Sequence, residues 1–100
     1  MALEIRENDG FFEISGRVNA QNIGVLDVYF ATVLEEREAI VVSIEKVREM
    51  DASGALFFEQ LYKKVGGQNK SVTIIGKYND EITKIMEVTK TDYILSSDHM

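Results

Sequence analysis

Two apolar runs rich in β-branched residues, each preceded by a segment with helical spacing, constrain the fold of this chain more than any other feature. The runs cover residues 39–44 (AIVVSI) and 71–75 (SVTII). Short runs of this kind are typical of strands buried on both faces, as in a parallel sheet that helices cover. A helix between two parallel strands forms a right-handed crossover. The pattern therefore predicts an α/β fold with a mostly parallel sheet.

Three segments carry apolar residues every three or four positions, which indicates one buried face of a helix. They cover about residues 21–37, 54–65 and 80–89. The residues expected at their ends are Asn19 or Asn22 before the first helix, Gly66-Gly67 after the second, and Asn79-Asp80 before the third. The positions expected to face the core are Ile23, Leu26, Phe30, Val33 and Leu34, then Gly54, Phe57, Phe58, Leu61 and Val65, then Ile82, Ile85, Met86 and Thr89.

The N-terminal residues predict a β-hairpin. Residues 3–6 and 11–17 have the composition of short strands, and Asn8-Asp9-Gly10 lies between them. Aspartate and glycine accept positive φ angles in tight turns. Residues 45–50 are polar and are expected to form a connection after the strand over 39–44. The complete order predicts a mixed, mostly parallel four-stranded sheet with an antiparallel edge hairpin, packed against three to four helices.

Length and composition limit the function as well as the fold. A chain of 100 residues predicts a single domain over 1–100, with a core over about 3–95 and a loose tail over 96–100. The absence of cysteine excludes a disulfide framework and thiolate chemistry. A net charge of −6 with scattered cations argues against nucleic-acid binding, because phosphate contacts need clustered lysine and arginine. No apolar run approaches the ~20 residues of a membrane span, and the first residues lack the apolar stretch of a signal peptide. We therefore expect a cytoplasmic protein without membrane insertion and without a cofactor.

The segment Asp51-Ala52-Ser53-Gly54 opens the second predicted helix, at the carboxyl end of a predicted parallel strand. Ligands and partners of open α/β sheets bind at this end of the strands. A helix start exposes unpaired N–H groups and a partial positive charge, which favour an anion. On spacing alone, an N-cap role for Asp51 or Ser53 is the simpler explanation. Both interpretations stay open at this point.

The stretch from Val47 to Gly54 (VREMDASG) resembles the signature of the STAS domain, the family of bacterial anti-sigma factor antagonists that also occurs at the ends of sulfate transporters. The resemblance extends from about residue 3 to 95. In the family's antagonists, the serine directly before the signature glycine is phosphorylated by a cognate anti-sigma kinase, and this residue corresponds to Ser53. Asp51 corresponds to the aspartate two residues earlier. The segment 16–19 (GRVN) lies where the family has Gly-x-hydrophobic-Asp.

The resemblance implies a protein-binding switch and not an enzyme. Docking to an anti-sigma factor that is also a serine kinase would be controlled by phosphorylation of Ser53, with a phosphatase as a further partner and a monomer or weak dimer as the oligomeric state. The residues implied in partner binding are Asp51, Ala52, Ser53, Gly54, Asn19 and Phe57. The chain departs from the family pattern at Ala52, at Asn19, and at Ala55-Leu56, which is followed by the bulky Phe57 and Phe58 where the signature usually continues with Leu-Gly. Both phenylalanines are expected to be buried, although one that is exposed beside Ser53 would be an apolar anchor for a partner.

Three other functions are alternatives to this switch. A response-regulator receiver would use Asp51 as its phosphoacceptor, but the chain lacks the acidic pair that a receiver has after its first strand. A serine hydrolase needs a base beside its nucleophile, and the only histidine is His99 near the C-terminus. A STAS-like module without phosphorylation, serving as a scaffold or binding a ligand in a signalling or transport complex, is the alternative that Ala52 and Asn19 favour.

Overall fold

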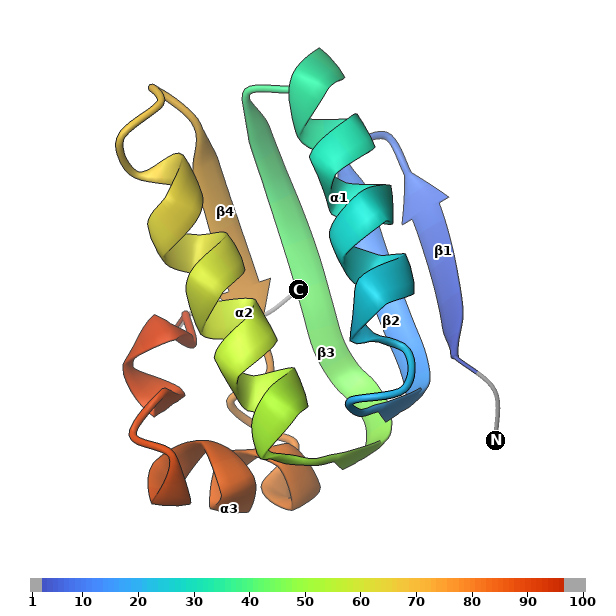
Figure 1. Cartoon of the computed structure of the whole chain (residues 1–100), viewed down its shortest axis with the longest axis vertical. Helices are drawn as coiled ribbons and strands as arrows, with labels where there is room; N and C mark the ends of the chain where they lie inside the picture. Colours follow the sequence, from blue (N-terminus) through green and yellow to red (C-terminus); the bar gives the residue numbers. More distant parts are fainter. Residues whose placement is uncertain (1–2, 97–100) are drawn as a thin grey trace.

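The computed structural model describes residues 3–96 and contains the predicted elements in the predicted order (Figure 1). In chain order these are β1 (Glu4–Asn8), β2 (Phe11–Val18), α1 (Ile23–Glu36), β3 (Ala39–Met50), α2 (Ala52–Val65), β4 (Ser71–Ile75), α3 (Asp80–Val88) and a short 3-10 helix, η1 (Asp92–Ile94).

The strands form one sheet in the order β1-β2-β3-β4. β1 pairs with β2 in the antiparallel direction, and β2, β3 and β4 are parallel. Asn8 pairs with Phe11, and the two residues between them have positive φ angles, 50° at Asp9 and 88° at Gly10. These angles are those of a two-residue hairpin turn. The mixed, mostly parallel sheet with its edge hairpin is therefore confirmed.

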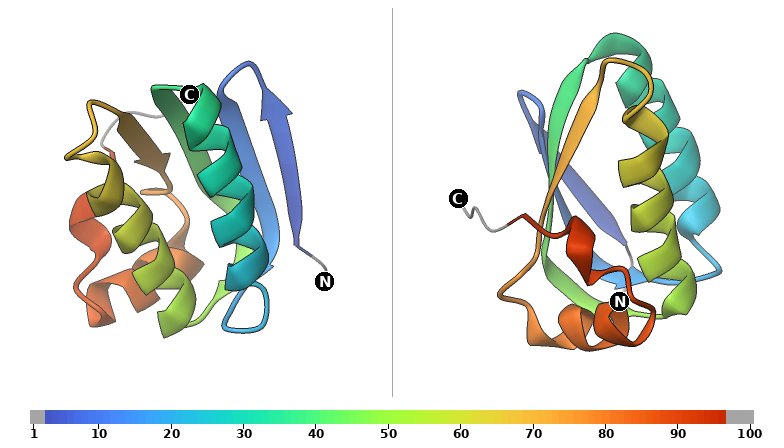
Figure 2. Two further views of the ribbon diagram at one scale, coloured as in Figure 1. Left: turned by 45° about the horizontal axis from the view of Figure 1, so that its top comes forward. Right: turned by 90° about the vertical axis from the view of Figure 1, so that its left-hand side faces the viewer.

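α1 and α2 lie on the same face of the sheet (Figure 2). Each parallel strand is added on the same side of the previous one, so two right-handed crossovers place both helices on one face. The expectation that the run over 39–44 is covered by helices on both faces is therefore wrong. Val41 lies on the other face and is only half-buried. α3 lies at the carboxyl ends of β3 and β4 (Figure 1).

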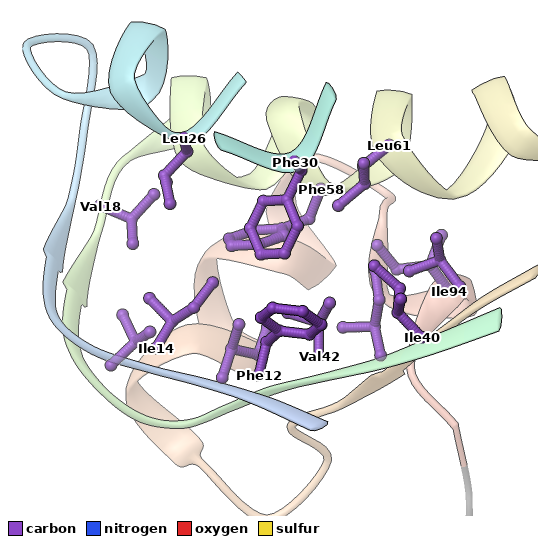
Figure 3. Close-up of a cluster of buried hydrophobic side chains, with 14 of the residues drawn as sticks. Phe12, Ile14, Val18, Leu26, Phe30, Ile40, Val42, Phe58, Leu61 and Ile94 are labelled. Atoms are coloured by element: carbon purple, nitrogen blue, oxygen red, sulfur yellow. The ribbon is translucent and has the colours of Figure 1, made fainter. Parts of the chain in front are cut away.

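The core fills the layer between the sheet and the two helices (Figure 3). Phe12 and Phe30 meet edge to face, with ring centroids 5.6 Å apart. Phe11 is half-buried and points to the opposite face, because successive strand residues alternate. The side chains that are completely shielded from solvent include Phe12, Ile14 and Val18 of β2, Leu26 and Phe30 of α1, Val42 and Ile44 of β3, and Phe58 of α2.

β3 continues to Met50, so the prediction of a connection over 45–50 is wrong. This second half of the strand pairs with β2 alone, since β4 ends opposite Ser43. Most of its side chains are charged, and Lys46, Arg48 and Glu49 are exposed, whereas Val47 is buried. Because the strand is longer than predicted, only Asp51 separates it from α2, and the start of α2 lies beside the end of β2.

The C-terminal part of the described chain runs along β4. Leu95 forms a parallel bridge with Ile74, and the Ser96 N–H donates a hydrogen bond to the Ile74 carbonyl oxygen at 2.8 Å. The remaining residues of the predicted tail, 97–100 with His99, lie outside the described residues. Within 3–96, no helix combines the length and the apolar character needed to cross a membrane.

Candidate functional site

The candidate site forms at Asp51, between β3 and α2. Its Oδ1 accepts a hydrogen bond from the Gly54 N–H at 2.9 Å, so Asp51 is the N-cap of α2. Its Oδ2 accepts a second hydrogen bond from the Ala20 N–H at 3.2 Å, in the loop between β2 and α1. The Asp51 N–H also donates to the Val18 carbonyl oxygen at 3.2 Å. Asp51 therefore holds together the two loops in which the sequence predicts binding residues.

Asn19 shapes the second of these loops. Its side-chain oxygen accepts a hydrogen bond from the Gln21 N–H at 2.9 Å, and its carbonyl oxygen accepts from the N–H groups of Asn22 and Ile23, both at 3.1 Å. The Asn22 side chain does not cap α1; it donates to the Arg17 carbonyl oxygen at 2.8 Å. Asn19 thus organises the turn that leads to Ala20 and its bond with Asp51.

Gly54 lies where α2 packs closely against the ends of β2 and β3. A Cβ atom at this position would lie 2.8 Å from Cγ of Met50 and 2.9 Å from the carbonyl oxygen of Val18. Real Cβ atoms do not come this close to other heavy atoms, and a backbone oxygen in a strand cannot move away easily. The glycine after Ser53 is therefore required for the packing of α2 on the sheet.

We predict that Gly54→Ala destabilises the domain by about 1–3 kcal/mol, because the added methyl group overpacks this contact. At this chain length, each kcal/mol lowers Tm by roughly 4–8 °C. Gly24→Ala in α1 is the matched control, since nothing lies within 4 Å of a Cβ atom there. Thermal unfolding followed by circular dichroism measures both variants. Equal stability of Gly54→Ala and Gly24→Ala would contradict the packing argument.

Ser53 is the second residue of α2 and is half-buried. Its hydroxyl group makes no hydrogen bond with any of residues 3–96, and the helix cap is provided by Asp51 instead. The N–H groups of Ala52 and Ser53 precede the first helical hydrogen bond, which Ala55 donates to Asp51. The helix start therefore offers a free hydroxyl, free N–H donors and a partial positive charge at one place.

A groove of about 530 Å³ adjoins Ser53 between α1 and α2. Phe57 lies one helical turn after Ser53, lines the groove and is half-buried. Phe58 is completely buried, so the expectation that both rings are buried is correct for Phe58 only. Leu56 is 47% exposed and extends the apolar lining toward solvent. The residues around the groove are Ile23, Gly24 and Asp27 of α1 and Ser53, Leu56, Phe57 and Gln60 of α2.

The sequence and the fold of the chain are similar to those of known proteins. The family model of the STAS domain matches residues 1–97. The chain belongs to the STAS domain family. Its fold is similar to that of an anti-sigma factor antagonist from Mycobacterium paratuberculosis, with a TM-score of 0.72 and 16% sequence identity over 94% of this chain and 81% of that one. No curated protein sequence matches the chain significantly.

In this STAS domain, the groove includes residues that the sequence analysis missed. Asp27, Leu56 and Gln60 belong to helix positions next to the predicted buried faces, so their spacing alone indicates ordinary exposed residues. The one local sign of the groove in the sequence is Leu56, a large apolar residue two positions after the signature glycine Gly54. The Asp27 side of the groove depends on how α1 packs beside α2, which no local pattern encodes.

The charges near Ser53 are mostly acidic. Asp51 lies two residues before Ser53, and Asp27 lines the groove. The cation at the end of β2, Arg17, is paired with Glu49 of β3, with Arg17 Nε 3.3 Å from Glu49 Oε1. Within residues 3–96 no three acidic or histidine side chains come together as metal ligands would. The site of this STAS domain is thus an apolar groove whose rim is acidic, with one unbonded serine hydroxyl beside it.

Proposed function

We propose that this STAS domain acts in the cytoplasm as an anti-sigma factor antagonist whose binding is switched at Ser53. In the unmodified state, the surface around Ser53 docks on an anti-sigma factor that is also a serine kinase. Phosphorylation of Ser53 releases the partner, and a phosphatase restores binding. The observation that carries the proposal is the hydroxyl of Ser53, a half-buried residue that lines the groove between α1 and α2, because this hydroxyl has no hydrogen bond to residues 3–96.

Docking would use the apolar lining of the groove. Leu56 and Phe57 offer partly exposed apolar area next to Ser53, which suits the desolvated centre of a protein interface. A phosphate on Ser53 adds a charge of roughly −1.5 to −2 at this centre. The carboxylates of Asp27 and Asp51 would face the same region, so the phosphate would be buried without a cation from this chain.

The domain itself should tolerate the phosphate. The partial positive charge of the α2 start offsets part of the added charge, and interactions between exposed charges are worth about 1 kcal/mol or less. Ser53 is not the helix cap, so its modification leaves the bonds of Asp51 to Gly54 and Ala20 in place. The switch would therefore change docking and leave the fold intact.

The same geometry favours binding over catalysis. A nucleophilic serine needs a base within hydrogen-bond reach, whereas the Ser53 hydroxyl is bonded to none of residues 3–96. The two carboxylate oxygens of Asp51 accept hydrogen bonds from the N–H groups of Gly54 and Ala20. These bonds give Asp51 a structural role, which also weakens the case for a receiver-type phosphoacceptor.

Intact-mass analysis of the protein from its native host tests the proposal. We expect a fraction heavier by one phosphate that maps to Ser53, disappears after phosphatase treatment and is absent from the Ser53→Ala variant. The variant should fold as the native protein does, because the hydroxyl is not a helix cap. A phosphate that persists in Ser53→Ala, or its absence under every growth condition that induces the protein, would contradict the proposal.

One observation favours a second candidate function, that of a STAS module which binds a ligand without being phosphorylated. The sheet face away from α1 and α2 carries a hollow of about 580 Å³, a size that suits small-molecule sites. Its lining is Phe11, Glu13, Ser43, Glu45, Lys46, Ile75 and Tyr78. A bound small molecule in native mass spectra, together with unmodified Ser53, would favour this function.

A further inference from the structure

β1 is the outermost strand of the sheet, and no described residue extends the sheet beyond it (Figure 1). The opposite edge is different, because Leu95 and Ser96 pair with Ile74 of β4. The unpaired edge of a strand presents free N–H and C=O groups that can pair with another strand. The edge of β1 is therefore available for pairing with a strand of complementary side chains.

The side chains of β1 are complementary to themselves. Glu4 and Arg6 are exposed on one face of the strand, with Arg6 Nε 3.0 Å from Glu4 Oε2. Ile5 points to the other face, toward the helices, and is half-buried. If a second copy of β1 pairs in the antiparallel direction with Ile5 opposite Ile5, then Glu4 of each copy lies opposite Arg6 of the other. The register centred on Arg6 would place like charges opposite each other, which is unfavourable.

The helix side of this edge offers apolar area for such a pair. A groove of about 380 Å³ lies between β1 and α1, and Glu7, Val28, Tyr29 and Thr32 are among its lining residues. Val28 is 68% exposed. In the register centred on Ile5, Leu3 of the second copy lies opposite Glu7, at this groove. Ile5 and Leu3 of the two copies would cover apolar surface that is half-exposed in the single chain.

We propose that two copies of this chain associate through β1, in the antiparallel direction and with Ile5 on the two-fold axis. The contact is isologous and extends the sheet to eight strands. Two Glu4–Arg6 pairs within the chains and two between them would form one alternating network on the exposed face. Because β1 has only five residues, the contact is small and the dimer is weak. The proposal does not rest on the function of Ser53, since the groove at Ser53 lies between α1 and α2.

Charge exchange tests the register. We expect sedimentation velocity between about 10 μM and about 1 mM to show a concentration-dependent dimer, weakened roughly tenfold or more by Glu4→Arg or by Arg6→Glu. The double variant E4R/R6E restores the opposite-charge pairs, so its dissociation constant should return to within about threefold of the native value. Lys84→Glu on α3 changes the net charge as Arg6→Glu does and should leave the dimer unchanged, because Lys84 is exposed on another element.

Disulfide trapping tests the same geometry without relying on charge. The chain contains no cysteine, so a single introduced thiol can link only to its copy. Ile5→Cys places the two thiols directly opposite, within disulfide reach, whereas Arg6→Cys leaves the two Cα atoms about 8 Å apart. Under mild oxidation we expect a covalent dimer of Ile5→Cys and none of Arg6→Cys. Equal cross-linking of both variants, or a native protein that stays monomeric at about 1 mM, would overturn the proposal.

Discussion

Ser53→Asp should weaken binding of the cognate anti-sigma factor by some hundreds of fold, while Ser53→Ala should bind within a few fold of the native domain. The proposed function places Ser53 at the centre of the interface, beside the carboxylates of Asp27 and Asp51. Burying an unpaired charge in such a contact costs several kcal/mol, and each 1.4 kcal/mol is a tenfold change in affinity. Alanine removes only a hydroxyl that has no partner among residues 3–96. Titration calorimetry with the purified anti-sigma factor measures the difference.

The control for this prediction is an equal charge change at a serine far from the site. Ser71 begins β4, at the amino ends of the parallel strands and therefore at the opposite end of the sheet from the start of α2. Ser71→Asp should leave the affinity within about twofold, because long-range effects of one exposed charge are screened by salt. Equal binding of Ser53→Asp and Ser53→Ala would eliminate the charge switch even if the partner itself is confirmed.

The order of the elements could be predicted from the sequence because most signals are local. The turn at Asp9-Gly10 needs only residues that accept positive φ, and the helix starts at Asp51 and Asn79 need only a side-chain acceptor near free N–H groups. The end of β3 was missed for a physical reason. Residues 46–50 pair with β2 alone, so their charged side chains are solvated and the segment has the composition of a loop.

The candidate site likewise combines features that local sequence predicts with features that only tertiary packing creates. Asp51 and Ser53 are close in the chain, and their adjacency at a helix start follows from sequence. The bond from Ala20 to Asp51 joins residues 31 positions apart, and the groove beside Phe57 exists only because α1 packs next to α2. The need for glycine at position 54 likewise comes from the distance to Val18, which is set by tertiary packing. Local patterns therefore identify Ser53 as the candidate residue for modification, and packing determines the surface around it.

Asn79→Asp should be among the most destabilising single-atom changes in the domain, at about 3–5 kcal/mol. The Asn79 side-chain nitrogen donates to three carbonyl oxygens of β3, those of Ile44 at 3.1 Å, Glu45 at 3.0 Å and Val47 at 2.8 Å. Its oxygen accepts from the Glu81 N–H at 3.1 Å and caps α3. Aspartate keeps the cap, but it replaces the donor with a negative charge that faces three acceptors.

Urea unfolding at neutral pH measures this loss, and Asp80→Asn is its control. Asp80 is the first residue of α3 and is exposed, so removing its charge should cost less than about 1 kcal/mol. Protonation of the introduced carboxyl group would restore one donor and remove the repulsion. The penalty is therefore fully present well above the pKa of that group in the folded state and should shrink as the pH falls through it. If Asn79→Asp unfolds at the same urea concentration as Asp80→Asn, the three bonds to β3 do not hold α3 at the end of the sheet.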